Sequence, residues 1–253
     1  MKSKLTLLNA GCYFCMIVVN VLALQIPFFG RTPGDVSDLY PHMLTPADFS
    51  FSIWSVIYIL LGVFIVYGFK LDDGNAPKEV SAIGWLFAVS SLLNISWLLT
   101  LQSLNFGWAT LSIFMYWVIL IVINYRLTKL GDARWYFTIP FGVYLGWICV
   151  ASLANHNVYL MVNDFSFFGL SEAVWTATLI GIGICGTLLV LFLNGDIWFT
   201  LVLIWAFFGI YMKNKDLSPI PTEVTYMTVF AMVFLTLAGL FSYNIRRKRL
   251  VNN

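Results

Sequence analysis

The chain is built from long apolar stretches separated by short polar connections. A helix needs about 20 apolar residues to cross the hydrocarbon core of a bilayer. Stretches close to that length occupy the ranges 5–29, 51–69, 80–101, 107–125, 135–154, 172–193, 197–212 and 223–244. With 44 aromatic residues (10 Trp, 12 Tyr and 22 Phe) and only 26 charged ones, the chain has too much apolar surface for a soluble core of ordinary size. The sequence therefore predicts an all-α integral membrane protein.

The number of spans depends on one turn. Asn194, Gly195 and Asp196 are the only break between the sixth and seventh stretches. These residue types favour turns, which predicts a tight helical hairpin and eight helices in total. Seven helices is the alternative. The first stretch is longer than the apolar region of a signal peptide and no small-x-small cleavage pattern follows it, so we expect it to be retained.

Lysine and arginine predict the orientation. If the N-terminus is cytoplasmic, 11 of the 14 basic residues lie on the cytoplasmic side, and only Arg31, Lys213 and Lys215 lie outside. This asymmetry follows the positive-inside rule and places both termini in the cytoplasm. We expect a multi-pass protein of a bacterial plasma membrane, in contact with lipid. The basic cluster Arg246–Arg249 is typical of a helix end at an anionic lipid surface, and we expect no nucleic-acid partner.

The interior of the predicted spans has few groups for chemistry. No Asp, Glu, Lys or Arg lies in the middle of a stretch, which argues against an ion-coupled transporter. No nucleotide-binding motif, haem-attachment motif or catalytic triad is recognisable, so we expect no enzyme and no metal site. The four cysteines are interpreted as packing residues, with a redox or metal role as the alternative. His42 and His156 are interpreted as solvated loop residues, although a haem ligand is an alternative.

Aromatic residues and amides gather in one half of the predicted bilayer. Alternating spans bring the start of the second and fourth helices to the face where the first, third and fifth end. A connection at residues 30–49, with three prolines, is long enough to cover that half as a lid. The sequence predicts a pocket for a flat hydrophobic ligand there, with an aromatic belt as the alternative. The candidate ligand-binding residues are Phe49, Phe51, Trp54, Tyr58, Asn94, Trp97, Trp108, Tyr144, Trp147 and Asn155.

Four short motifs in this region carry a family resemblance. The stretch from Pro46 to Gly62, with Trp54 and Tyr58, resembles the second-helix signature of the tryptophan-rich sensory protein or translocator protein (TspO/MBR) family. Leu93-Asn94-Ile-Ser-Trp97 resembles the third-helix motif, and Gly107-Trp108-Ala109 the start of the fourth helix. Tyr144-Leu-Gly-Trp147, followed by Asn155, is similar to the fifth-helix pattern.

The resemblance implies a five-helix bundle over residues 1–160, with a pocket open toward the connection between the first two helices. It also implies a tetrapyrrole (porphyrin or haem) ligand, a sensory role and a homodimer. Residues 155–170 contain no Lys or Arg, so the family's sterol site is not carried over. Residues 161–253 add three helices that the five-helix family lacks. A small-residue stripe there, Ala177, Gly181 and Cys185, predicts a helix contact.

Three functions remain open at this stage. The leading hypothesis is a membrane ligand-binding or sensory protein with an aromatic-lined pocket. The alternatives are an uncoupled permease for a small apolar solute and a partner-binding subunit of a membrane complex. The sequence does not name the ligand.

Overall fold

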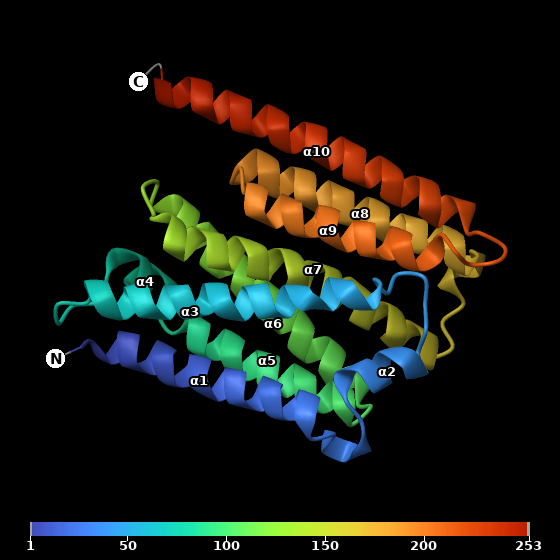
Figure 1. Cartoon of the computed structure of the whole chain (residues 1–253), viewed down its shortest axis with the longest axis horizontal. Helices are drawn as coiled ribbons and strands as arrows, with labels where there is room; N and C mark the ends of the chain where they lie inside the picture. The colour runs from blue at the N-terminus through green and yellow to red at the C-terminus, as the bar shows by residue number, and fades with distance from the viewer. Residues whose placement is uncertain (1, 252–253) are drawn as a thin grey trace. The chain divides into compact units, whose positions relative to one another are not determined.

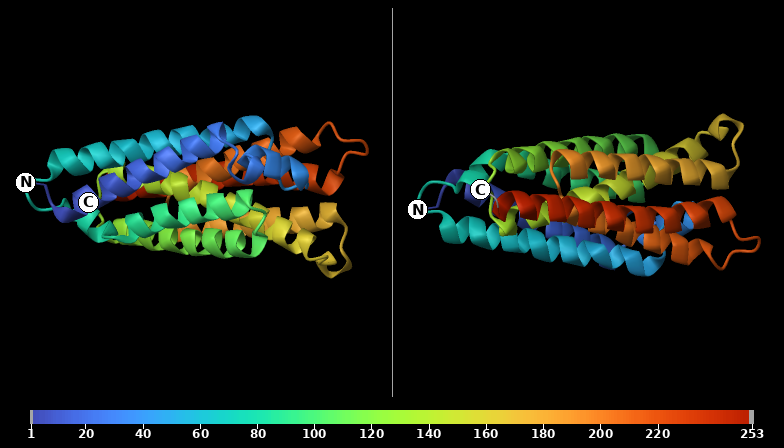
Figure 2. Two further views of the ribbon diagram at one scale, coloured as in Figure 1. Left: turned by 90° about the horizontal axis from the view of Figure 1, so that it is seen from below. Right: turned by 90° about the horizontal axis from the view of Figure 1, so that it is seen from above.

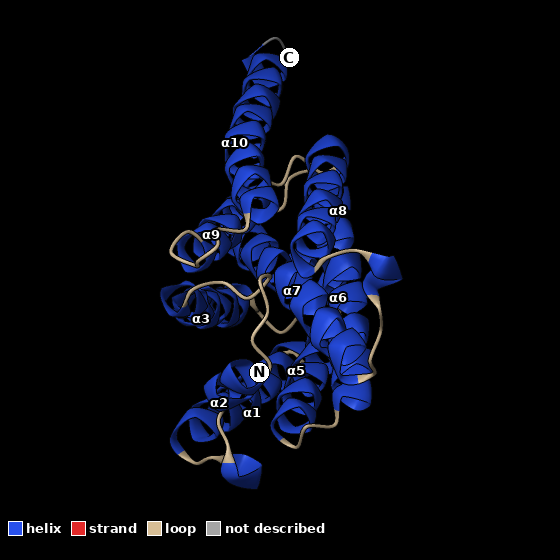
Figure 3. Cartoon of the chain, turned by 90° about the vertical axis from the view of Figure 1, so that its right-hand side faces the viewer, coloured by secondary structure: helices blue, strands red, loops and turns tan. Residues whose placement is uncertain are grey.

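A computed structural model describes residues 2–251, with side chains described as far as Asn244. Every regular element in that part of the chain is helical, as Figure 3 shows by colour. Seven of the described helices are long and apolar enough to cross a membrane, and the apolar helix Leu86–Gln102, with 17 residues, is shorter. The all-α membrane fold is therefore confirmed. Of the eight predicted spans, seven meet the length of a membrane crossing.

The helices are labelled in Figure 1. Their bounds are α1 Lys4–Gln25, α2 Pro33–Leu39, α3 Ile53–Leu71, α4 Lys78–Ile83, α5 Leu86–Gln102, α6 Phe106–Lys129, α7 Trp135–Val162, α8 Glu172–Leu193, α9 Ile197–Asn214 and α10 Thr222–Val251. Three short 3-10 turns lie between them: η1 Phe28–Gly30, η2 Asp48–Ser52 and η3 Phe167–Gly169.

The chain divides into two compact units. The first comprises Met1–Pro41 and Trp54–Tyr159, and the second comprises His42–Ile53 and Leu160–Asn253. Residues 42–53, which we call the strap, therefore belong with the C-terminal helices, although in sequence they follow α2 and end at the first residue of α3. Nothing in the hydropathy pattern indicates that residues 42–53 belong to the second unit.

The first unit is held together by apolar helix faces. In Figures 1 and 2, α5 and α6 run side by side, and α1 packs along α5. Near the middle of α3, Phe64 makes edge-on ring contacts with Phe87 of α5 and Phe141 of α7, with centroids 5.1 and 5.2 Å apart. All three rings are buried. Such contacts add about 0.5–1.5 kcal/mol each to the free energy of burial.

Several helix boundaries differ from those predicted. The stretch 80–101 is not one helix, because α4 ends at Ile83 and is followed by Gly84, whose φ of 62° is a left-handed conformation that favours glycine. The first helix ends at Gln25 rather than at residue 29, just before Pro27. The connection 30–49 is not a simple loop either. It contains α2, which Thr32 begins with a reciprocal capping box to Asp35.

A buried ion pair fixes the start of α7 in the first unit. Glu79 of α4 has a fully buried side chain and receives two hydrogen bonds from the Arg134 guanidinium, at 2.8 and 2.6 Å. The backbone nitrogen of Arg134 donates to the same carboxylate at 3.2 Å. Burial raises the pKa of Glu79, but the hydrogen bonds and charge of Arg134 outweigh it and lower that pKa below its ordinary value. The residue is therefore ionised at neutral pH.

The second unit contains the strap, α8, α9 and α10. The predicted break is present: α8 ends at Leu193 and α9 begins at Ile197, where the Asp196 side chain accepts a hydrogen bond from Phe199 N at 3.1 Å. Figure 2 shows α8, α9 and α10 in orange to red, running alongside one another.

The predicted small-residue contact on α8 is wrong. A Cβ added at Gly181 would meet no atom within 4 Å, and Cys185 is exposed. The buried face of α8 instead carries Thr176, Ile180 and Gly183. Small size alone did not locate the packing face, because the helix is apolar on every side.

Candidate functional site

An aromatic cluster in the first unit is centred on Trp54, in the first turn of α3. Its ring stacks on Tyr58 with centroids 5.6 Å apart, and on Trp97 of α5 at 6.0 Å. The edges of Tyr144 and Trp147, both on α7, meet it at 6.4 and 6.5 Å. Three helices thus bring four rings against one indole.

Helical spacing explains why these side chains meet. Trp54 and Tyr58 are four residues apart on α3, and Tyr144 and Trp147 are three apart on α7, so each pair lies on one helix face. Tyr144 and Trp147 are buried, whereas Trp54 and Tyr58 are only partly buried. The cluster therefore has an inner wall on α7 and a more accessible side on α3.

A chain of amides adjoins the rings. The Asn20 amide of α1 donates to Asn94 Oδ1 at 2.7 Å, and the Tyr58 hydroxyl donates to Asn20 Oδ1 at 2.7 Å. The Asn94 amide nitrogen and the Trp97 indole nitrogen are both buried, and neither has a hydrogen-bond partner among the residues that the structure describes. Two buried N–H donors beside stacked rings could bind the polar edge of a ligand.

Three further residues of this region carry no motif that marked them in the sequence. Asn20 and Met16 lie on α1, and the Tyr144 hydroxyl lies 3.7 Å from the Met16 sulfur. Tyr116 of α6 packs its ring edge-on against Tyr144 at 5.3 Å. Asn20 could have been found, because an amide in the middle of an apolar helix needs a polar partner.

Other predicted site residues lie outside the ring contacts. Trp108 is 60% exposed at the start of α6. Asn155 is buried on α7, and its Oδ1 has no hydrogen-bond partner among the described residues. Phe49 and Phe51 belong to the strap in the second unit, where Phe49 packs against Trp205 at 5.3 Å. Their role in ligand binding stays a prediction.

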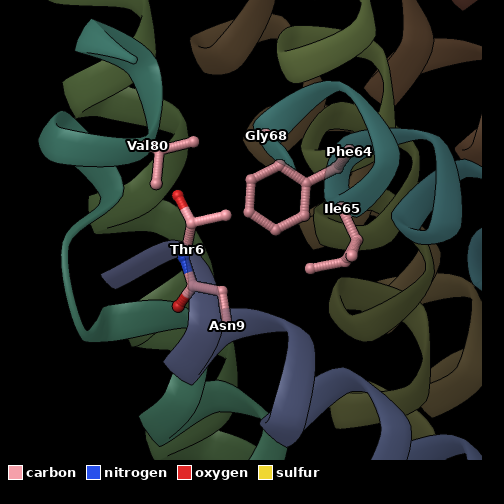
Figure 4. Close-up of a pocket in the computed structure, with 6 residues that line it drawn as sticks. All are labelled: Thr6, Asn9, Phe64, Ile65, Gly68 and Val80. Carbon is pink, nitrogen blue, oxygen red and sulfur yellow. The ribbon is translucent and has the colours of Figure 1, made fainter. Parts of the chain in front are cut away.

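Two hollows in the first unit differ in character from the ring cluster. The smaller, shown in Figure 4, has a volume of about 10 Å³ and lies between Thr6 and Asn9 of α1, Phe64 of α3 and Val80 of α4. Both polar atoms of the Asn9 amide are buried without a partner in the described chain, and the space suits about one water molecule. The larger is an open hollow of about 390 Å³ beside α2, bordered by Arg31, Asp35 and Asp38. Neither is lined by a ring of the Trp54 cluster.

The histidines are not solvated loop residues. His42 is only 8% exposed, and its Nε2 lies 3.1 Å from the Thr45 hydroxyl. Burial and the charge of Lys213 lower the pKa of His42 to about 4. His156 lies within α7, with Nδ1 2.8 Å from the Ser152 carbonyl. Among the described residues, no group of three or more His, Cys, Asp or Glu side chains is placed to hold a metal ion.

The ring cluster offers contact area and hydrogen-bond donors. A comparison with protein families found a match to a model described as TSPO-like protein, over residues 6–241. The match confirms the resemblance read from the motifs, and it continues past α7 through α8 and α9 into α10. The searches of curated proteins and of solved structures found no match.

Proposed function

The chain belongs to the TSPO-like protein family, and on this premise we propose that it is a membrane ligand-binding or sensory protein whose aromatic cluster takes a porphyrin-like or other flat hydrophobic molecule. The observation that carries the proposal is the convergence of Tyr58, Trp97, Tyr144 and Trp147 on the Trp54 ring. Stacking on tryptophan would supply contact area, and the donors of Asn94 and Trp97 would orient a carbonyl or carboxylate.

The ring contacts also bear on affinity. Trp54 already stacks on Tyr58 and Trp97, so a flat ligand that stacks on Trp54 has to replace one of these contacts. Each such contact is worth about 0.5–1.5 kcal/mol, which is subtracted from the ligand's own stacking energy. We therefore expect micromolar binding, a free energy of roughly 8 kcal/mol.

Titration of the purified protein with protoporphyrin tests the proposal. We expect saturable quenching of tryptophan fluorescence, and we expect Trp54→Ala and Trp147→Ala each to weaken binding by about 1–3 kcal/mol. Asn94→Leu keeps the side-chain volume and removes the polar contact, so it measures the contribution of the amide. The control is Trp85→Ala, which removes an indole that is 64% exposed and lies outside the cluster.

The proposal fails if the wild-type protein shows no saturable quenching, or if both cluster variants bind as tightly as Trp85→Ala. A permease would instead be indicated by uptake of a small apolar solute into liposomes that contain the protein. Co-purification of a second membrane protein would favour the subunit role.

We further propose a homodimer in a bacterial plasma membrane that binds its ligand without catalysing a reaction. The non-catalytic role is supported by the lack of Asp, Glu, Lys and Arg in the middle of the apolar stretches, and the homodimer by the family resemblance. Recovery of chemically unchanged porphyrin after incubation with the protein is the expected result.

A further inference from the structure

A buried chain of side-chain hydrogen bonds joins three helices of the first unit beside the Trp54 cluster. The Tyr58 hydroxyl of α3 donates to Asn20 Oδ1 of α1 at 2.7 Å, and Asn20 Nδ2 donates to Asn94 Oδ1 of α5 at 2.7 Å. Asn20 Nδ2 also donates to Met16 O, one turn earlier on α1, at 2.8 Å. The oxygen and both N–H groups of the Asn20 amide are therefore occupied.

A main-chain carbonyl sets the direction of this chain. The oxygen and the nitrogen of an asparagine amide have nearly the same shape, so shape alone does not decide which way the amide is turned. A carbonyl oxygen only accepts hydrogen bonds. Met16 O therefore requires the nitrogen of Asn20, which leaves the Asn20 oxygen for the Tyr58 hydroxyl. The second N–H of Asn20 in turn requires the oxygen of Asn94.

This constraint leaves the N–H groups of Asn94 for other partners. Among the described residues, Asn94 Nδ2 has no hydrogen-bond partner, and neither has Trp97 Nε1. Asn94 and Trp97 are three residues apart on α5 and share a face, and both are more than nine-tenths buried. An amide nitrogen and an indole nitrogen donate and do not accept. Because an unpaired buried donor is costly, a ligand that supplies an acceptor here is favoured.

We propose that Asn20 is a positioning residue of the ligand site: by holding Asn94 Oδ1, it turns the Asn94 N–H groups toward the ligand. Among flat hydrophobic molecules, the site then selects those with a hydrogen-bond acceptor such as a carbonyl and disfavours those whose polar edge is an N–H donor. In its consequence for selectivity the inference rests on the proposed function. Its statement about the direction of the Asn94 amide is independent of any ligand.

Two flat tricyclic probes of nearly equal shape distinguish acceptors from donors. Fluorenone carries a carbonyl oxygen at the position where carbazole carries an N–H. Equilibrium dialysis of the purified protein with each probe gives two dissociation constants, and their ratio measures the selectivity. Dialysis with the same detergent without protein corrects for partition of the probes into the micelle.

We expect the wild type to bind fluorenone at least about tenfold more tightly than carbazole, whose N–H would be buried against two other donors. Asn20→Leu keeps the side-chain volume nearly unchanged and frees the Asn94 amide to turn, so it should lower this ratio by about three- to tenfold. Asn9→Leu is the matched control, because it makes the same change at another buried amide of α1, and it should leave the ratio unchanged. A merely structural role of Asn20 would weaken both probes alike.

A measurement without ligand tests the direction of the Asn94 amide by itself. In NMR spectra of protein with isotope-labelled asparagine, the side-chain signal of Asn94 is identified by its loss in Asn94→Leu, and that of Asn20 by its loss in Asn20→Leu. The nitrogen signal of an amide that donates hydrogen bonds lies downfield of that of a free amide. We therefore expect the Asn20 signal downfield and the Asn94 signal at the free position. If Asn20→Leu does not fold, the Asn94 signal alone serves as the test.

The inference is overturned if Asn20→Leu has the same ratio of dissociation constants as the wild type, or if Asn9→Leu lowers the ratio as much as Asn20→Leu. It is also overturned if the Asn94 nitrogen lies at the hydrogen-bonded position without ligand. A wild type that gives the expected Asn94 signal and binds neither probe refutes the proposed function alone.

Discussion

At the scale of a residue, the buried His42 predicts a pH dependence of stability. Its folded-state pKa is lowered from 6.5 to about 4 by burial and by the charge of Lys213. A lowered histidine pKa means that the folded state holds the neutral ring, so the stabilisation is complete above about pH 6.5 and is lost as the pH falls toward 4. The shift corresponds to at most about 3 kcal/mol.

Thermal unfolding in detergent at about pH 7 and pH 4.5 measures this loss. His42→Gln keeps a polar side chain that does not titrate, and we expect it to lose less stability over the same pH interval than the wild type. Equal losses in the two proteins would show that His42 does not contribute.

The ring cluster was largely predictable at the residue scale, since alternation of spans and helical spacing brought Trp54, Tyr58, Trp97, Tyr144 and Trp147 to one region. Trp108 was assigned to the same half of the bilayer, but which way its ring points depends on the rotation of α6. An apolar helix gives no sequence signal for that rotation, because both lipid and protein neighbours accept apolar residues.

At the scale of an element, α7 depends on the ion pair of Glu79 and Arg134. Removing one partner leaves the other charge unpaired, so Glu79→Leu should destabilise the protein by about 3 kcal/mol. The estimate is at the low end for a buried pair because 35% of the Arg134 side chain is exposed. The double variant Glu79→Leu/Arg134→Met should regain most of the loss, since apolar replacements of a buried pair are often neutral.

Denaturation in detergent, analysed as a double-mutant cycle, checks this expectation. A Glu79→Leu protein as stable as the wild type would mean that the pair contributes nothing.

The spans around this ion pair were predictable because hydropathy reports burial in lipid directly. The pair was not, since its partners lie 55 residues apart and each resembles an ordinary loop charge.

The strap shows a further limit of sequence reading at this scale. Its hydrogen bonds join main-chain atoms to residues as far as 171 positions away. Backbone groups carry no sequence signal, and Gly209 of α9, whose carbonyl accepts a hydrogen bond from Ala47 N, looks like any glycine in a membrane helix, where glycine is common. Only the three-dimensional arrangement distinguishes it from Gly181, which has no neighbour within 4 Å of an added Cβ.

At the scale of the whole molecule, the basic residues predict how the chain crosses the bilayer. A single cysteine in place of Asn163, expected outside, should react with an impermeant reagent in intact cells. A single cysteine in place of Asn75, expected in the cytoplasm, should react only in inverted vesicles. Protein whose native cysteines are replaced serves as the background. Reaction of both positions from the same side would refute the orientation with both termini in the cytoplasm.

The exchange of residues 42–53 into the second unit has a consequence for biosynthesis. The hydrogen bond from Trp205 to Ser50 spans 155 residues, so α9 is translated long after the segment it receives. At about 5–20 residues per second, the delay is roughly 8–30 s. During that interval the strap cannot bind α9, because α9 has not been made. In nascent chains stalled before residue 205, we therefore expect a protease to cleave the strap.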